Sequence, residues 1–221
     1  GLSFGAGGIL ANQDEFRSHP FWGASGIGSN QGHNELYDAI VRTTATREML
    51  VRRMRTLMDR YWQPPGTPEA ERVLERHIAE MLKKMAPEAA LDRAKWGESW
   101  NAADGATPER SMELGVRELQ RRFIDLRRKH FYVTHCATNE ARRVGVGTRL
   151  RAGIPGPQPD ACVVRIAATG LGDAQRGDGI RLTNTHPFAV DVSGWKLGGD
   201  VKFPLPAGMV IPSQGAAIVA A

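Results

Sequence analysis

Few residues in this chain have the types and spacing that catalysis or metal binding requires. Asp14 and Glu15 are adjacent carboxylates that could hold a metal, although solvated loop acids are the simpler interpretation. His19 and His33 have no acidic or cysteine partner at ligand spacing and are interpreted as surface or packing histidines. Ser193 lacks the Gly-x-Ser-x-Gly setting of a nucleophile elbow. The sequence therefore predicts no catalytic, cofactor-binding or metal-binding residue.

The opening stretch "GLSFGAGG", residues 1–8, holds four of the 25 glycines and raises the question of a phosphate-binding loop. A P-loop requires Lys followed by Ser or Thr after its last glycine, but the first basic residue here is Arg17. A dinucleotide-binding fingerprint requires a strand directly before its first glycine, and the sequence given has no residues before Gly1 that could form one. From its composition alone, we interpret residues 1–8 as a mobile glycine-rich segment.

Cys136 and Cys162 flank a stretch rich in proline and glycine. Two cysteines are too few for a zinc site made of thiolates. A disulfide that closes the stretch and two unpaired, partly buried thiols are both compatible with the spacing, and the second is our preferred interpretation.

Composition narrows the class of protein. The chain has 221 residues and a formal charge of +5, so it has room for one or two domains. The basic residues of 36–135 are interleaved with acidic ones over predicted helices, which argues against a nucleic-acid interface. No apolar run approaches the length of a transmembrane helix, and no signal peptide is visible in this stretch of sequence.

Apolar residues at helical spacing predict an all-α lobe over about 35–135. A first helix over 35–62 ends at "QPPG", because proline cannot continue it. Thr67-Pro68-Glu69 has the composition of a helix start, Pro87-Glu88 opens a third segment, and Thr107-Pro108-Glu109 opens a fourth. The predicted apolar stripes are Leu50, Met54, Leu57 and Tyr61; Leu74, Ile78, Met81 and Met85; and Met112, Val116, Leu119, Phe123 and Leu126. We predict core roles for these stripes and a solvated position for Arg52, Arg53, Arg55 and Arg60.

The hydrophobic period changes to two after residue 160. Residues 137–160 end in "GIPGPQPD" and predict an extended linker. Beyond it, alternating segments separated by turn residues predict a small antiparallel β-sandwich. Cys162, Val164 and Ile166 are predicted to face inward, and Trp195 is predicted to be its central core residue. The fold class is therefore α+β in two parts: residues 1–136, a linker over 137–160, and a β domain over 161–221.

The stretch "GIRLTNTHPFAVDVSGWKLGGDVKFPLPAGMVIPSQGAAIVA" resembles the lamin tail domain found in bacterial secreted proteins. The matching elements are a strand over 179–184, "VDVSGWKL" over 190–197 and a hairpin over 203–215. The resemblance implies an immunoglobulin-like sandwich, with further strands that normally follow the one ending near Val219. The domain is therefore expected to be incomplete in this stretch.

The helical part resembles the C-terminal region of the CotH family of atypical protein kinases. The features that carry this resemblance are "ELYDAIVRTTATREMLVRRMRTLMDRYW", the "ALDRAKWG" segment around Asp92 and Trp96, and "LQRRFIDLRRKHF". In that family the catalytic core ends in Trp-Asp-x-Asp-Leu-Ser/Thr-Phe-Gly, so "GLSFG" matches the tail of the motif. Gly1 then takes the place of the metal-binding Asp, and glycine has no side-chain oxygen for Mg²⁺.

Together these resemblances imply a non-catalytic C-terminal portion of a CotH-like kinase that acts on exported or surface proteins. ATP and magnesium are expected only in a complete parent kinase, whose location would be extracellular or at the bacterial cell surface. The lamin tail domain would bind a protein or a cell-surface component. An alternative is an inactive surface or structural protein in which that domain is the binding unit. A catalytic parent kinase and an inactive surface protein differ in the residue that precedes Leu2 in the uninterrupted coding sequence. An Asp there favours catalysis, and a native Gly argues against it.

Overall fold

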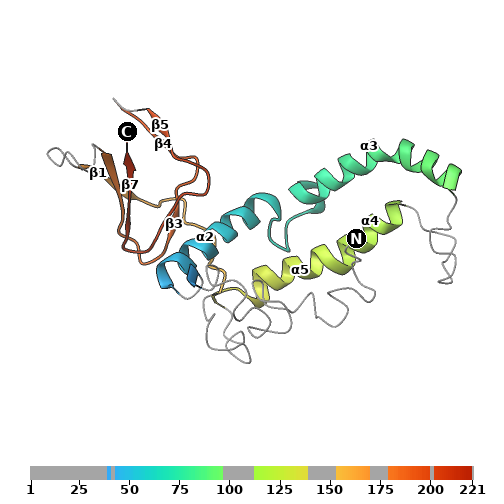
Figure 1. The fold of residues 1–221 in the computed structure, drawn as a ribbon. Helices are drawn as coiled ribbons and strands as arrows, with labels where there is room; N and C mark the ends of the chain where they lie inside the picture. Colours follow the sequence, from blue (N-terminus) through green and yellow to red (C-terminus); the bar gives the residue numbers. More distant parts are fainter. Residues whose placement is uncertain are drawn as a thin grey trace. The chain divides into compact units, whose positions relative to one another are not determined.

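The computed structural model describes residues 39–40, 43–96, 112–138, 153–169, 179–199 and 202–220. These residues combine helices with antiparallel strands, which confirms the α+β class (Figure 1). They divide into two compact units. A helical unit contains the described residues of Met58–Thr134, and a β unit contains the described residues up to Leu57 and from His135 onward.

Helix α2, Thr44–Tyr61, is buried on a different face from the one that its apolar spacing predicts. The buried residues are Val51, Arg52, Arg55 and Met58. Leu57 and Tyr61 are exposed, so the predicted stripe is wrong at these two positions. Arg52 and Arg55 bind backbone carbonyls, which offsets the cost of removing their charges from water.

The segment after α2 begins a helix later than predicted. Gln63 has a left-handed φ of 57°, and its amide Nε2 donates to the carbonyl of Arg60 at 2.7 Å. Thr67-Pro68 leads into a 3₁₀ turn, η2 (Glu69–Glu71), and α3 starts only at Val73. The side-chain oxygen of Gln63 accepts a hydrogen bond from the Val73 N–H at 2.9 Å. The Gln63 side chain therefore caps the first turn of α3, a role that the sequence assigns to Thr67.

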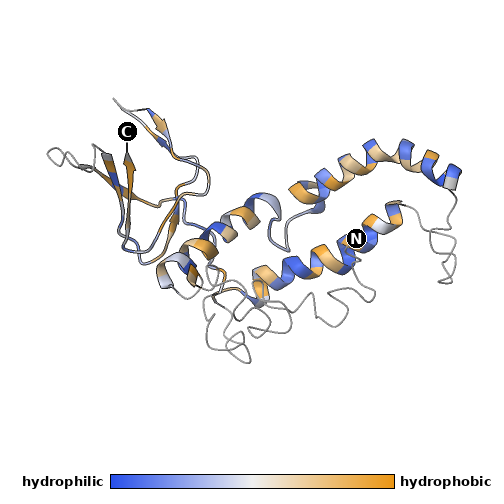
Figure 2. Cartoon of the chain, viewed as in Figure 1, coloured by the Kyte–Doolittle hydropathy of each residue, from blue (hydrophilic) through white to orange (hydrophobic). Residues whose placement is uncertain are grey.

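Helix α3, Val73–Trp96, contains Pro87 within its length, and the predicted break at this proline is wrong (Figure 1). Proline removes one backbone donor from a helix but does not forbid continuation when the local bend is tolerated. Pro87 is exposed to solvent. Figure 2 shows apolar and polar residues interspersed along α3. The predicted core stripe of this helix is wrong at Met85, which is exposed.

The last helical stretch changes its phase twice. Helix α4, Met112–Leu119, continues into the π-helical turn η4, Gln120–Ile124, then α5, Asp125–Lys129, and a second π turn, η5, His130–Thr134. Each π turn holds an extra residue and rotates the residues that follow around the helix axis. Leu126, which follows η4, is exposed, whereas Ile124, Arg128, His130 and Tyr132 are buried; Leu119, which precedes η4, is exposed as well. The predicted stripe is therefore wrong at Leu119 and Leu126, and the π turn accounts for the change of phase at Leu126.

The strands follow the predicted alternation closely. They are β1 (Val164–Thr169), β2 (Gly179–Asn184), β3 (Val190–Asp191), β4 (Lys196–Leu197), β5 (Phe203–Pro204), β6 (Val210–Ile211) and β7 (Ala216–Ala220). They form one sheet in the order β1-β2-β7 and two pairs, β3-β6 and β4-β5, all antiparallel. Gly194 and Gly208 adopt positive φ values of 73° and 86° in the turns after β3 and before β6, where L side chains would be strained.

The β unit has one apolar core. Its buried members are Leu182, Val190, Val192, Leu205 and Ile211, and half-buried residues such as Ile180 and Phe188 pack against them. The predicted inward positions of Leu182, Val190 and Val192 are confirmed. Ile166 lies opposite Leu182 on the neighbouring strand but is 61% exposed, because the core covers β2 more fully than the edge strand β1.

Trp195 is not the central core residue that the sequence predicts. Its side chain is 37% exposed, and Val190, Val192 and Ile211 fill the centre of the core instead. The smaller branched side chains of β3 and β6 lie opposite one another at Val190 and Ile211. They leave Trp195 at the margin of the apolar cluster.

Residues 153–160, the C-terminal end of the predicted linker, pack within the β unit. Ile154 is buried and forms a parallel bridge with Cys136, with backbone hydrogen bonds of 2.8 Å on both sides. Arg52 and Arg55 donate to the carbonyls of Gly156 and Pro155 at 2.9 and 3.0 Å. Residues 153–160 therefore belong structurally to the β unit, together with the first part of α2.

Candidate interaction site

Asp191 is the centre of a polar network in the β unit. Its carboxylate accepts hydrogen bonds from Thr56 Oγ1 at 2.6 Å, from Arg53 Nη1 at 3.1 Å and from the Ser193 backbone N–H at 2.9 Å. The Ser193 hydroxyl also donates to it. Gln158 completes the set, because its amide group bonds both the N–H and the C=O of Asp191. Three segments far apart in sequence meet at this aspartate.

Hydrogen bonding keeps Asp191 ionised. Burial opposes the charged form, but the bonds from Ser193, Thr56 and Arg53 outweigh burial and hold the pKa of Asp191 below its usual value. Its hydrogen bonds with Arg53, Thr56 and Ser193 join α2 to the turn after β3.

Ser193 lies in the turn that follows β3. Its Oγ receives hydrogen bonds from Arg53 Nη1 and from the Gly208 backbone N–H, both at 3.0 Å. Gly194, the next residue, takes the left-handed conformation. This environment orders the turn and agrees with the interpretation of Ser-Gly-Trp as a turn and packing feature.

A second buried polar cluster lies in the helical unit. Arg128 is 1% exposed and pairs with Glu75 through Nη2, with Asp125 at 2.6 Å and with the carbonyl of Trp62 at 3.1 Å. Arg72 reaches both Glu75, at 3.4 Å, and Asp125, at 3.2 Å. The second oxygen of Glu75 has no hydrogen-bond partner among the residues that the structure describes. The cluster ties α3, α5 and the end of α2 together.

An aromatic pair lies on the outside of the β unit. Leu197 is opposite Phe203 in the β4-β5 pair, and the Leu205 N–H donates to the Trp195 carbonyl at 2.7 Å. Leu197 and Phe203 therefore share one face of the hairpin. Leu205 is buried and Leu197 packs on the core, whereas Trp195 and Phe203 are 37% and 39% exposed.

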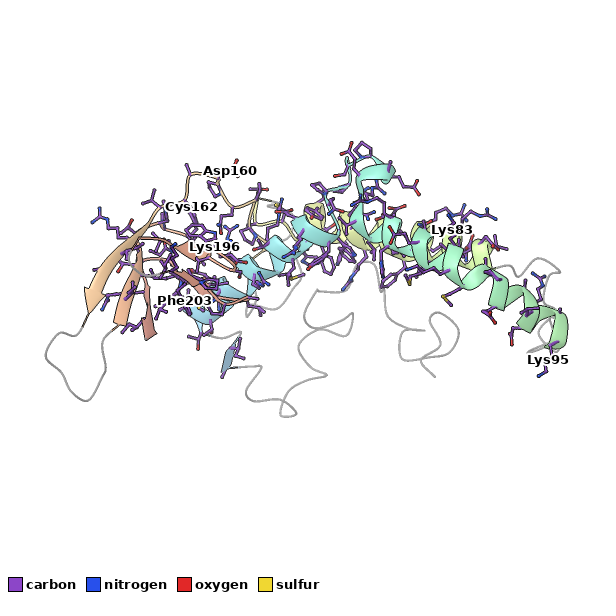
Figure 3. All side chains as sticks on the ribbon, turned by 90° about the horizontal axis from the view of Figure 1, so that it is seen from above. Lys83, Lys95, Asp160, Cys162, Lys196 and Phe203 are labelled. Atoms are coloured by element: carbon purple, nitrogen blue, oxygen red, sulfur yellow. The ribbon has the colours of Figure 1, made fainter. Side chains whose placement is uncertain are left out.

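Exposed lysines neighbour Trp195 and Phe203 along the sequence. Lys196 lies opposite Pro204 on the other face of the hairpin, and Lys202 precedes Phe203. Figure 3 labels Lys196 and Phe203 on their neighbouring strands. Partly exposed Trp and Phe side chains are enriched in protein-binding surfaces.

The two cysteines are free, which confirms the preferred interpretation of unpaired, partly buried thiols. Burial raises the pKa of the Cys136 thiol, but hydrogen bonds at Thr138 and the charge of Arg55 outweigh it, so that the pKa is lowered. Burial raises the pKa of Cys162, which Arg52 only partly offsets. Cys136 is therefore the more readily ionised of the two.

Several residues considered from the sequence lie outside the described residues. These are Gly1 and its "GLSFG" motif, Asp14, Glu15, His19 and His33. Within the described ranges, no group of three or more His, Cys, Asp or Glu side chains could hold a metal ion.

The residues that organise the two units were missed by sequence reasoning. The pattern places Asp191 in an apolar strand, predicts a solvated position for Arg52, and indicates no buried role for Arg128. The Asp-x-Ser-Gly order over 191–194 was the available signal, because an aspartate two residues before a turn serine commonly bonds that residue's N–H. The buried arginines carried no such local signal, because their partners are distant in sequence.

Comparisons with protein-family models, curated proteins and solved structures find no match for this chain. Among the helices that the structure describes, none is both long and apolar enough to cross a membrane.

Proposed function

We propose that this chain is the non-catalytic C-terminal portion of a CotH-like protein kinase of exported or surface proteins. In this proposal its β unit is a lamin-tail-like module, an immunoglobulin-like sandwich that binds a protein or a cell-surface component. The observation that carries the binding role is the half-exposed pair Trp195 and Phe203 on a hairpin fixed to the core. Such a surface is positioned rigidly before a partner arrives, which lowers the ordering cost of binding.

The electrostatics of the described residues support a non-catalytic role. Glu75 and Asp191 are the buried carboxylates of the described ranges, and each bonds to arginine. A catalytic carboxylate must be free to bind a metal or a substrate hydroxyl. The Asp191 carboxylate is instead held by contacts within the chain, and Glu75 is buried with one of its oxygens bound to Arg72 and Arg128.

The binding role is tested by co-sedimentation of the 221-residue chain with washed bacterial cell walls, before and after protease treatment of the walls. Replacing both Trp195 and Phe203 with Ala is expected to weaken binding at least about tenfold, because exposed aromatic anchors dominate binding energy. Tyr61→Ala is the matched control, since Tyr61 is an exposed aromatic in the helical unit. Unchanged binding by the folded double variant would contradict the proposal, and protease treatment separates a protein partner from a glycan.

The non-catalytic assignment is tested separately with Mg·ATP. Calorimetry on the intact chain is expected to give no binding in the micromolar range, and incubation with a basic protein is expected to transfer no phosphate. Micromolar affinity together with phosphate transfer would overturn this part of the proposal and leave the binding role untouched.

A further inference from the structure

The extended segment over residues 154–159 begins with an apolar anchor. Ile154 is 2% exposed. Its N–H donates to the His135 carbonyl and its carbonyl accepts the Ala137 N–H, both at 2.8 Å. These partners belong to the β unit, as the segment does. One buried side chain and two main-chain hydrogen bonds therefore fix where the segment starts.

Two buried arginines of α2 hold the next two carbonyls of the segment. Arg55 Nη1 donates to the Pro155 carbonyl at 3.0 Å, and Arg52 Nη1 donates to the Gly156 carbonyl at 2.9 Å. Hydrogen bonds from a charged donor are roughly twice as strong as those between neutral groups. These two contacts recognise the backbone of the segment and not its side chains.

The Gln158 side chain binds the main chain of β3. Val190 and Val192 direct their backbone groups toward β6, so the peptide groups of Asp191 point to the other edge of the strand. Gln158 Oε1 accepts the Asp191 N–H at 2.7 Å, and Gln158 Nε2 donates to the Asp191 carbonyl at 3.1 Å. The side-chain amide therefore takes the place that a peptide group of a neighbouring strand would take.

The composition of the segment fits this role. Pro155, Pro157 and Pro159 have no N–H and favour an extended backbone, so the segment cannot pair with β3 as an ordinary strand. Asp191 is 3% exposed, and buried peptide groups require hydrogen-bond partners. Glutamine supplies both a donor and an acceptor, whereas glutamate lacks the donor and asparagine is one methylene shorter.

We propose that Arg52, Arg55 and this outer edge of β3 form a recognition site for extended segments that carry a glutamine between two prolines, and that residues 154–159 occupy the site in cis. A partner segment with the same pattern binds by replacing the chain's own segment. Extended proline-rich segments lose little conformational freedom on binding, which favours them as ligands. The site uses a surface other than the Trp195 hairpin and does not rest on the proposed function.

Occupation in cis sets the competition that a partner meets. A tethered segment acts at an effective concentration in the millimolar range. A free segment at lower concentration therefore binds poorly to the unmodified chain. Removing the two Gln158 hydrogen bonds from the tethered segment shifts the balance toward the free one.

The probes are two fluorescein-labelled peptides, GIPGPQPDA and GIPGPAPDA, which copy residues 153–161 with glutamine or alanine in place of Gln158. Gln158→Ala in the intact chain should speed amide exchange at Asp191 at least about threefold, because the N–H loses its acceptor. By anisotropy, the glutamine peptide should bind this variant at least about fivefold more tightly than it binds the unmodified chain. It should also slow the exchange at Asp191 again, whereas the alanine peptide should do neither.

Two further variants test the role of the glutamine side chain. Pro157→Ala is the matched control, because Pro157 is an exposed position of the same segment, and it should leave exchange at Asp191 unchanged. Gln158→Asn keeps the amide but shortens its reach, so it should behave like Gln158→Ala. Even if these variants fail to fold, excess glutamine peptide should move the side-chain amide signals of Gln158 in the unmodified chain toward the position of a solvent-exposed amide.

Three results decide the inference. Equal binding of the two peptides to Gln158→Ala would overturn the recognition of glutamine. Exchange at Asp191 that no peptide slows, together with unmoved Gln158 signals in the unmodified chain, would reduce the segment to a structural linker and overturn the site. Replacement of Trp195 and Phe203 by Ala should leave peptide binding unchanged, so that failure of this site leaves the proposed function standing.

Discussion

At the scale of single residues, polar side chains without solvent contact decide the local geometry. Asn184 is fully buried, and its amide donates to the carbonyls of Phe188 at 2.8 Å and Pro212 at 2.9 Å while its oxygen accepts the His186 N–H at 2.9 Å. One side chain thus fastens the loop after β2 to the loop after β6. Hydropathy ranks such a residue as surface, so its position was not predictable from pattern alone.

The two thiols give a prediction at the same scale. Because the pKa of Cys136 is lowered and that of Cys162 is raised, Cys136 holds the larger thiolate fraction at any pH near neutrality. Iodoacetamide is therefore expected to alkylate Cys136 faster than Cys162. Both rates should increase with pH, and the increase for Cys136 should occur in a lower pH range than the increase for Cys162.

Mass spectrometry of the alkylated chain at several pH values measures both rates. Cys136→Ser and Cys162→Ser assign the signals, and Arg55→Gln should slow Cys136 by removing a nearby positive charge. Faster reaction at Cys162 near pH 7 would show that access to the thiol, rather than its ionisation, controls the chemistry.

At the scale of elements, the strands were predictable and the helix faces were not. Period-two alternation and glycine turns located β2 and β3 and the inward positions of Leu182 and Val190, because each strand's core contact is decided within a few residues. The faces of α2 and α5 depend on distant partners. Arg52 and Arg128 are buried because carbonyls and carboxylates far away in sequence receive them.

The π turns explain the remaining difference in the helices. A stripe counted at 3.6 residues per turn loses its phase after η4, so the residue that faces inward is Ile124 and not Leu126. No residue type marks a π turn in advance. The likeness to kinase and lamin tail sequences remains a prediction, as does the sandwich arrangement of the three sheets.

The attachment of α2 to the strands gives a prediction at this scale. Asp191→Asn removes the charge that Arg53, Thr56 and Ser193 stabilise, and hydrogen bonds to charged groups contribute about 1.5–3 kcal/mol each. We expect the free energy of unfolding of the β unit to fall by about 2 kcal/mol at pH 7. Urea unfolding measures the loss, with Asp92→Asn on exposed surface of α3 as the control.

The same carboxylate predicts a direction of pH dependence. Its folded pKa lies below the unfolded value, so its stabilisation is fully present above about pH 4, the usual range of Asp, and is lost as pH falls through the folded pKa. The difference in stability between the unmodified chain and Asp191→Asn should therefore shrink as the solution is acidified. A difference that stays constant down to pH 2 would mean that the network does not depend on the charge of Asp191.

At the scale of the whole molecule, the boundary between compact units falls inside a helix. Residues of α2 up to Leu57 belong to the β unit, and those from Met58 belong to the helical unit. A change in hydrophobic period cannot reveal this, because the period is helical on both sides of the boundary. The boundary follows instead from where side chains bind: Arg52 and Thr56 to the β unit, and Asp59 to Tyr132.

This division predicts two separable unfolding reactions. Leu182→Ala removes a core side chain of the β unit, and Ile124→Ala removes one from the helical unit, so each should cost its own unit about 2–5 kcal/mol. Hydrogen exchange in low urea, read out on peptides from β2 and from α3, measures the two stabilities separately. Leu182→Ala should speed exchange in β2 and leave α3 unchanged, and Ile124→Ala should do the reverse.

Helix α2 contains the boundary between the two units, so its own amides test whether the units unfold separately. Amides of Thr44–Leu57 are expected to follow the β unit and lose protection in Leu182→Ala, because Arg52, Arg53 and Thr56 lose their partners when the strands unfold. Amides near Tyr61 are expected to respond to Ile124→Ala instead, because Arg128 holds the carbonyl of Trp62. If both variants release all of α2 together with every other peptide, the chain unfolds as one cooperative body and the division within the helix has no energetic meaning.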